Sequence, residues 1–88
     1  MRVWRMAGSP HPWCILHALV ADPGGDGTGR SLVNAALHEA RKRGFKYIVT
    51  TTYQSRSAAN HLYSSSGFSR MLKTYEQDRQ VNWYGQPL

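Results

Sequence analysis

Hydrophobic and polar residues alternate with a changing period along the chain, and these changes predict where strands and helices lie. Residues 2–7 and 13–20 are predicted strands, separated by glycine and proline residues at 8–12 that interrupt regular structure. In the second run, Trp-Cys-Ile-Leu-His-Ala-Leu-Val, apolar side chains occupy both alternating faces, as in a strand that is covered on both sides. The two runs together predict a hairpin that leads into a central strand.

The middle of the chain changes to a helical period. One predicted helical face carries the apolar residues Leu32, Val33, Ala36, Leu37 and Ala40. Gly44 follows this stripe and is a natural stop for the helix. Residues 47–52 are rich in β-branched and aromatic side chains and predict the next strand. Strand, helix and strand in this order indicate a βαβ unit, whose two strands run parallel.

A second helix is predicted from about residue 56, with Ser55 or Ser57 as its capping residue. Its apolar face consists of Ala58, Ala59, Leu62 and Tyr63. Gly67 is expected to end this helix, and Phe68 is placed to fold back on its last turn. A compact helix with one buried face follows from this pattern.

The remaining residues predict a closing hairpin, with strands at 69–75 and 80–84 joined by Glu76-Gln77-Asp78. The sequence contains no internal repeat, low-complexity tract or linker, so residues 1–88 are expected to form a single domain. The predicted order of elements is β-β-α-β-α-β-β. The predicted fold class is therefore α/β (α+β), with a mixed sheet and two helices.

Composition supports a small globular domain. The 88 residues, 41% of them hydrophobic, allow one modest core and are too apolar for a disordered chain. No run reaches the roughly 18 apolar residues of a membrane span, and residues 1–7 do not resemble a signal peptide. The single cysteine, Cys14, cannot form an internal disulfide and fits a reducing, cytoplasmic location. Its apolar neighbours predict a buried, unreactive thiol.

The chain is basic, with 11 Lys and Arg against 5 Asp and Glu and a formal net charge of +6. This balance favours a polyanionic partner: nucleic acid, an acidic surface or a phosphorylated cofactor. The basic cluster at residues 41–43 ends a predicted helix, where cations suit the helix dipole. A nucleic-acid-binding alternative has only weak support, in the last hairpin, from Tyr75, Arg79, Trp83 and Tyr84. The four histidines are unevenly spaced and predict no metal site.

A glycine-rich segment, residues 22–29, lies between a predicted strand and a predicted helix. Glycines there let backbone N–H groups and the free amides of the helix start converge on a phosphate, and Arg30 adds a positive charge. An ordinary flexible turn remains an alternative. A dinucleotide-binding motif needs glycine where Leu32 stands, and a P-loop needs lysine where Arg30 stands, so neither motif is complete.

Two segments together resemble the GNAT superfamily of N-acetyltransferases. That family has Q/R-x-x-G-x-G/A at a helix start; here Gly-Gly-Asp-Gly-Thr-Gly at 24–29 matches the G-x-G part, with Gly24 in place of Gln or Arg. The family's next helix reads roughly N-x-x-A-x-x-L-Y-x-x-x-G-F. Residues 56–68 read Arg-Ser-Ala-Ala-Asn-His-Leu-Tyr-Ser-Ser-Ser-Gly-Phe, which departs from it at Arg56. The resemblance covers residues 13–68 and implies the acetyl-CoA-binding, C-terminal half of the GNAT fold.

The resemblance also implies a reaction, in which a primary amine of an unidentified acceptor directly attacks the thioester of acetyl-CoA. It makes Tyr63 the general acid that protonates the departing thiolate, against the alternative that this tyrosine only packs. In the family, pantetheine pairs with the main chain at the end of the central strand, where an N–H also stabilises the oxyanion. The residues implied in binding acetyl-CoA are Leu19, Val20, Ala21, Gly24, Gly25, Asp26, Gly27, Thr28, Gly29, Arg30, Arg56 and Ala59.

The general base is less well defined. Many family members use a strand glutamate, but residues 13–20 contain no carboxylate. His17 is the candidate base because an imidazole has a suitable pKa, and a packed strand histidine is the alternative. Some acceptors need no base.

A typical family member is longer and begins with a strand and two helices that help to bind the acceptor. Without them, a half-covered sheet would expose Trp4 and Trp13, which predicts a homodimer, a larger assembly or a partner chain that completes the fold. The same shortfall leaves a second function open, a non-catalytic acyl-CoA-binding module.

Overall fold

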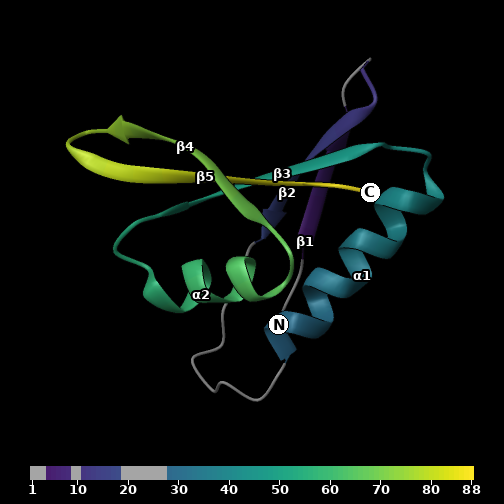
Figure 1. Cartoon of the computed structure of the whole chain (residues 1–88), viewed down its shortest axis with the longest axis horizontal. Helices are drawn as coiled ribbons and strands as arrows, with labels where there is room; N and C mark the ends of the chain where they lie inside the picture. Colours follow the sequence, from purple (N-terminus) through teal and green to yellow (C-terminus); the bar gives the residue numbers. More distant parts are fainter. Residues whose placement is uncertain (1–3, 9–10, 19–27) are drawn as a thin grey trace.

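The computed structural model describes residues 4–8, 11–18 and 28–88. Along the chain, the elements are strands β1 (Trp4–Gly8) and β2 (Trp13–Ala18), helix α1 (Thr28–Lys42), strand β3 (Tyr47–Tyr53), helix α2 (Ser57–Ser65), and strands β4 (Ser69–Glu76) and β5 (Arg79–Pro87) (Figure 1). This order is the predicted β-β-α-β-α-β-β, and the α+β class is confirmed. Within the described ranges, neither helix is long and apolar enough to cross a membrane.

The described strands form one mixed sheet in the order β1-β2-β3-β5-β4. As predicted for a βαβ unit, β2 and β3 are parallel neighbours joined through α1, and the other neighbouring pairs are antiparallel. The closing hairpin turns at Gln77 and Asp78, both in the left-handed region with φ of 50° and 65°. A two-residue turn of this kind matches the twist of the strands it joins.

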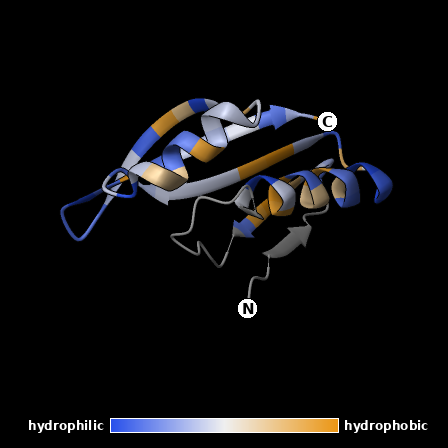
Figure 2. Ribbon diagram, turned by 90° about the horizontal axis from the view of Figure 1, so that it is seen from below, coloured by the Kyte–Doolittle hydropathy of each residue, from blue (hydrophilic) through white to orange (hydrophobic). Residues whose placement is uncertain are grey.

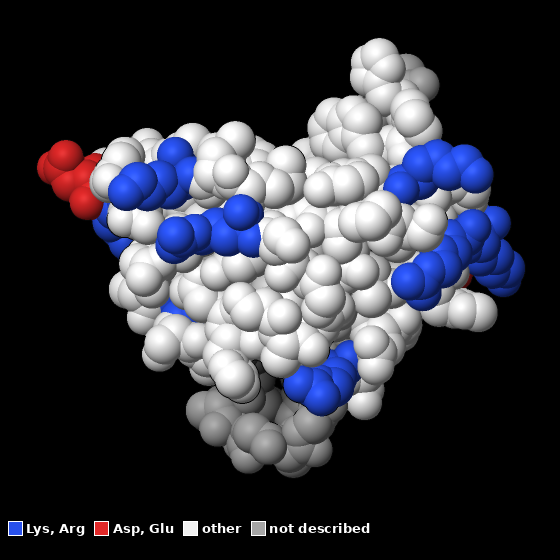
Figure 3. Space-filling view, viewed as in Figure 1, with Lys and Arg blue, Asp and Glu red and all other residues white. Residues whose placement is uncertain are grey.

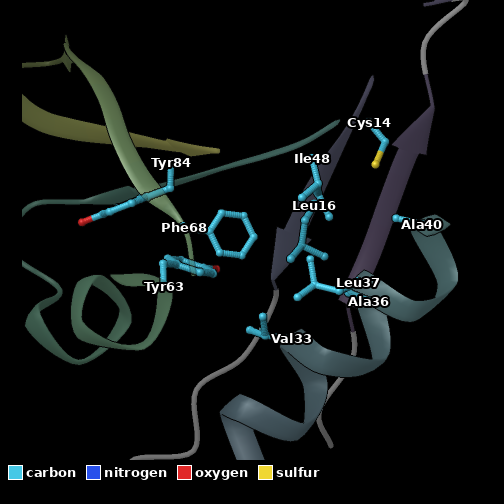
Figure 4. Packing of buried hydrophobic residues seen from close by; sticks show 10 residues of the cluster. All are labelled: Cys14, Leu16, Val33, Ala36, Leu37, Ala40, Ile48, Tyr63, Phe68 and Tyr84. Atoms are coloured by element: carbon cyan, nitrogen blue, oxygen red, sulfur yellow. The ribbon is translucent and has the colours of Figure 1, made fainter. Parts of the chain in front are cut away.

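The two helices of the described chain pack on the same face of the sheet. Along β2 and β3 the side chains on this face alternate with those on the other, and Leu16, Ile48 and Thr50 are almost fully buried. Figure 2 shows the hydrophobic residues of α1 where the helix lies against the strands. The core that results joins both helices to the sheet (Figure 4) and consists of Cys14, Leu16, Val33, Ala36, Leu37, Ala40, Ile48, Tyr63, Phe68 and Tyr84.

The end of α2 follows the prediction, but its start does not. Gly67 has a φ of +92°, which glycine adopts without strain, and the Phe68 N–H then donates to the Tyr63 carbonyl over 3.1 Å. Neither Ser55 nor Ser57 is the capping residue. Arg56 occupies the N-cap position and, among the described contacts, makes no side-chain capping bond, so Ser57 is already the first helical residue.

The opposite face of the sheet differs from the expectation that β2 is covered on both sides. Trp13 is 36% exposed and His17 is exposed, because both described helices lie on the other face. At the edge of the sheet, every residue of β4 is exposed, including Met71, Leu72 and Tyr75. The described chain therefore has one covered face and one open face; we call the latter the open face.

Candidate active site

The parallel strands β2 and β3 separate part way along their length. Their paired residues run from Trp13 with Tyr47 to Leu16 with Thr50. Beyond that pair, β3 continues to Tyr53 and, among the described strands, pairs only with β5, while β2 ends at Ala18 (Figure 1). The sheet thus opens between its two parallel strands at the level of Leu16 and Thr50, a position we call the β2–β3 opening.

Tyr63 is held beside this opening by aromatic packing. It lies on α2 and is only 3% exposed. The Phe68 ring meets it edge-on, with ring centroids 5.5 Å apart, and the Tyr84 ring of β5 lies 5.6 Å away at a tilt (Figure 4). Since Phe68 is fixed by its own N–H bond to the Tyr63 carbonyl, the phenol ring is confined from two sides.

The Tyr63 phenol lies near Thr50, in the last pair of the β2–β3 ladder. Thr50 donates its hydroxyl proton to the Leu16 carbonyl over 2.8 Å. Burial raises the pKa of the Tyr63 phenol above its ordinary value, and the nearby Thr50 hydroxyl and the positive charge of Arg56 partly oppose this rise. At neutral pH the phenol is therefore protonated and can act as an acid.

Asn60, one turn before Tyr63, ties α2 to both neighbouring strands. Its amide nitrogen donates to the carbonyls of Tyr53 and Arg56, over 3.0 and 2.8 Å. Its oxygen accepts from the Tyr84 hydroxyl over 2.6 Å and from the Asn82 amide over 2.8 Å. Asn82 is itself 1% exposed and also donates to Gln54. The helix that carries Tyr63 is thus positioned by a satisfied, largely buried polar network.

The start of α1 meets α2 at the same end of the molecule. A Cβ atom on Gly29 would lie 3.1 Å from a methyl carbon of Leu62, so glycine allows the two helices to approach closely. The Arg30 guanidinium donates to the Ser65 hydroxyl over 3.0 Å. We had expected Gly29 to matter for the approach of a phosphate, and its packing against α2 is a second reason for a glycine there.

The predicted site residues divide into three groups. Residues 19–21 and 24–27 lie outside the described residues, so nothing is stated of their structure. Thr28 begins α1, Ala59 packs at the border of the core, and Arg56 is the N-cap of α2. His17 follows Leu16 directly and, within the described residues, is exposed on the open face, opposite Tyr63.

Sequence reasoning did not single out Thr50 or Asn60, and it considered Tyr84 only for nucleic-acid binding. Thr50 looked like an ordinary β-branched strand residue and Asn60 like a polar position on a helix surface. One sequence signal could have identified Thr50 and Asn60: each is a polar residue on a face that the strand or helix period predicts to be buried. Thr50 lies two residues after Ile48 in the strand, and Asn60 lies three residues before Tyr63 in the helix.

The surface charges do not form one continuous stripe on the face in view. Figure 3 shows Lys and Arg gathered over the end of α1, where Arg41 and Lys42 lie, and acidic residues at the tip of the β4–β5 hairpin. Of the hairpin residues considered for nucleic-acid binding, Tyr84 is buried and Arg79 stacks on the Tyr53 ring, 3.7 Å from its centroid. Among the described residues, no three His, Cys, Asp or Glu side chains gather as metal ligands.

Comparison with solved structures shows which fold this is. The IAA acetyltransferase from Bacillus cereus superposes with a TM-score of 0.85 at 16% identity, covering 99% of this chain and 69% of that one. A Bacillus subtilis acetyltransferase in complex with CoA gives 0.85 at 18% identity, covering 99% and 68%. The ribosomal-protein-S18-alanine N-acetyltransferase from Escherichia coli gives 0.73 at 25% identity, covering 86% and 54%. The architecture is that of the acetyltransferases, and this chain spans about half to two thirds of each of these proteins.

Comparison of the sequence with known protein families identifies the family of this chain. Residues 3–68 match the acetyltransferase (GNAT) family. A search of curated protein sequences finds no significant match. The chain belongs to the GNAT acetyltransferase family, as the motifs at residues 24–29 and 56–68 had indicated.

Proposed function

We propose that this protein is an N-acetyltransferase that moves an acetyl group from acetyl-CoA to a primary amine. The observation that carries the proposal is the position of Tyr63, whose hydroxyl lies at the β2–β3 opening, buried and protonated at neutral pH. A buried phenol that only filled space would not need to meet the end of a parallel strand pair. Family membership and the CoA-bound relative of similar fold support the same conclusion.

The residues present fit acetyl-CoA. The first turn of a helix leaves backbone N–H groups without a partner inside the helix, and the first turn of α1 carries no acidic side chain, which favours a diphosphate there. We propose that residues 24–30 hold the diphosphate and that the main chain of Leu19, Val20 and Ala21 pairs with pantetheine. Arg56 and Ala59, at the start of α2, complete the binding residues.

Direct transfer accounts for all atoms. The amine nitrogen attacks the thioester carbonyl, a C–N bond forms, and the C–S bond breaks. Tyr63 gives its phenolic proton to the departing thiolate, and main-chain N–H groups at the β2–β3 opening stabilise the oxyanion. The amine proton leaves to a base or to water, and solvent returns a proton to Tyr63.

The candidate base is His17. It lies on the open face, one residue beyond the last β2–β3 pair, and it is exposed, so an amine arriving from that face would meet the imidazole. Tyr63 approaches the β2–β3 opening from the covered face. Acid and base are thereby placed on opposite sides of the sheet, which keeps the two proton transfers apart.

A non-catalytic acyl-CoA-binding module is the second candidate, because residues 13–20 contain no carboxylate that could act as a general base. Isothermal titration with CoA tests binding for both candidates, and thiol release from acetyl-CoA with a panel of primary amines tests turnover. We expect both binding and turnover. Binding without turnover on any amine would support the module.

The role of Tyr63 is tested by Tyr63→Phe, with Tyr75→Phe as the matched control because Tyr75 is 65% exposed and lies outside the core. We expect Tyr63→Phe to lower kcat by about 100-fold, within the range for loss of a general acid. The affinity for CoA should stay nearly unchanged, and Tyr75→Phe should leave both quantities as they are. Equal kcat for all three proteins would remove Tyr63 from the mechanism.

We propose, further, that the open face around Trp13 is covered in the working protein, by a second copy or by a partner chain, while the end of β2 at His17 stays open to the acceptor. Half-exposed apolar residues on that face and on β4 support this, because single apolar patches of that kind favour association. The buried Cys14, whose thiol pKa is raised by burial, is unreactive and suits a cytoplasmic location.

A further inference from the structure

We propose that Arg79 binds a carboxylate of the acceptor, so that the preferred substrates are primary amines that carry a carboxylate group. The inference rests on the proposed function and names the substrate class of the same site. It is carried by a contact between Arg79 and Tyr53 on the open face, beyond the β2–β3 opening.

The register of the sheet places this contact on the face from which the acceptor arrives. Tyr53 directly follows the buried Thr52 in β3, so its side chain leaves the strand on the other side, the open face. In β5, Arg79 lies two residues before Val81, which is paired with Tyr53. Since side chains two residues apart lie on the same face of a strand, Arg79 and Tyr53 are both on the open face.

The Tyr53 ring holds the guanidinium of Arg79 in place. The central carbon of the guanidinium lies 3.7 Å from the ring centroid, which is a cation–π contact. A guanidinium carries its N–H donors in a planar fork that matches the two oxygens of a carboxylate. Because Arg79 is also exposed, an incoming carboxylate can reach these donors at a guanidinium that is already positioned.

Two acidic residues of the same hairpin do not hold this guanidinium. Glu76 is the cross-strand partner of Arg79 in β4, and Asp78 directly precedes it in the chain. Within the described ranges, neither carboxylate forms an ion pair with Arg79, whose side chain extends instead to the neighbouring strand β3. An arginine that served only to balance the hairpin charges would turn towards these acids. Its orientation therefore favours a ligand beside the end of β3.

The spacing along β3 indicates how far the carboxylate lies from the amine. Thr51 is the first residue of β3 beyond the last β2–β3 pair, and Tyr53 follows two residues later, about 7 Å along the strand. Trp83 is paired with Thr51 on the same face and offers an apolar surface to the chain that joins amine and carboxylate. An ω-amino acid such as 6-aminohexanoate spans this distance in its extended form, whereas glycine is too short.

The test compares the acetylation of 6-aminohexanoate with that of hexylamine, which has a similar length and no carboxylate. We expect kcat/KM of the wild type to be roughly ten-fold higher for 6-aminohexanoate, as for a hydrogen bond between charged groups. Arg79→Gln should abolish this preference, and Arg79→Lys should keep part of it, because lysine retains the charge but not the fork. The matched control is Arg70→Gln, at an exposed arginine of β4, which should keep the whole preference.

A second pair of amines separates the two sources of such a carboxylate. The amidated dipeptide Gly-Glu is compared with amidated Gly-Gln, which differs only by the charge. A preference for Gly-Glu that depends on Arg79 would extend the substrate class to peptides with an acidic side chain. A preference confined to 6-aminohexanoate would limit the class to small amino acids, and either result supports the inference.

Two outcomes would overturn the role of Arg79: no preference for the carboxylate in either pair of amines, or a preference that survives Arg79→Gln. Circular dichroism checks that this variant is folded. If it is not, Arg79→Lys takes its place, and an undiminished preference in that variant would count against the inference.

A binding measurement separates this inference from the proposed function. If the wild type acetylates no amine, the proposed function fails, and NMR then tests Arg79 alone. Its side-chain N–H signal, assigned with Arg79→Lys, should shift on titration with 6-aminohexanoate in the presence of CoA, and not with hexylamine. A signal that stays in place with both amines would overturn the inference as well.

Discussion

Tyr63 and Cys14 show, at the scale of single residues, how the covered face changes the chemistry of its side chains. Cys14 is 0% exposed, and burial raises its pKa from the ordinary 9.0, with Arg43 opposing the rise. Burial raises the pKa of Tyr63 from the ordinary 10.0 in the same way. For Cys14 the result is a thiol that resists ionisation, and for Tyr63 it is a phenol that keeps its proton at neutral pH.

These raised pKa values predict how stability depends on alkaline pH. Each acid holds its proton more tightly in the folded protein than in the unfolded chain, so both states are equally protonated below the ordinary pKa. As the pH rises through 9.0 for Cys14 and 10.0 for Tyr63, the unfolded chain loses its proton first and the free energy of unfolding falls. Urea denaturation at a series of pH values measures this fall.

Two variants show which of the two groups causes each part of this fall in the free energy of unfolding. Cys14→Ala should flatten the first part of the curve and Tyr63→Phe the second, each relative to its own value at pH 7. A wild-type curve that is level up to about pH 11 would show that neither group is buried as the structure has it.

At the scale of helices and strands, Asn60 connects α2 to the end of β3 and to β5 by hydrogen bonds. Asn60→Ala would leave the Tyr84 hydroxyl and the Asn82 amide without this acceptor, and the Tyr53 and Arg56 carbonyls without this donor. Because buried groups without partners are costly, we expect the free energy of unfolding to fall by about 2 kcal/mol or more. Chemical denaturation followed by circular dichroism measures this change.

The control is His61→Ala, on the same helix but exposed, which should change stability by less than about 0.5 kcal/mol. Asn60→Ala should also lower kcat, because α2 carries Tyr63. Two variants of equal stability would mean that the network around Asn60 does not hold the helix.

Elements were predictable from the sequence where a period or a glycine defined them. The stripe from Leu32 to Ala40 gave α1, and Gly67 gave the end of α2, because one buried face and one left-handed residue leave clear patterns. The predicted capping residue of α2 was wrong, because the preference of serine for the N-cap is weak and the path of the chain places Arg56 there instead. Tyr63 came from the family motif, but the bond from the Thr50 hydroxyl to the Leu16 carbonyl could not be predicted, since it depends on which residue lies opposite Thr50 in β2.

The whole molecule is asymmetric, with two helices on one face of the described sheet and an open face opposite. The sequence predicted strands with apolar residues on both faces of β2, and this much was right. It could not show that both helices cover the same face, because that depends on β4 lying on the far side of β3 from β2.

Association through the open face is the prediction at this scale. Size-exclusion chromatography with light scattering should give the mass of a dimer or a larger assembly at low micromolar concentration. Trp13→Ser should shift the mass towards the monomer, because it removes a large apolar side chain from that face, whereas Lys42→Ser at the exposed end of α1 should not. A folded wild-type monomer would contradict the prediction.

The central claim is that the β2–β3 opening receives the thioester of acetyl-CoA beside Tyr63. A crystal structure with acetyl-CoA tests it most directly. We expect the sulfur within hydrogen-bonding reach of the Tyr63 hydroxyl, the diphosphate against residues 24–30, and the pantetheine along the end of β2. Acetyl-CoA bound elsewhere, with the Tyr63 hydroxyl still enclosed and far from the sulfur, would contradict the account.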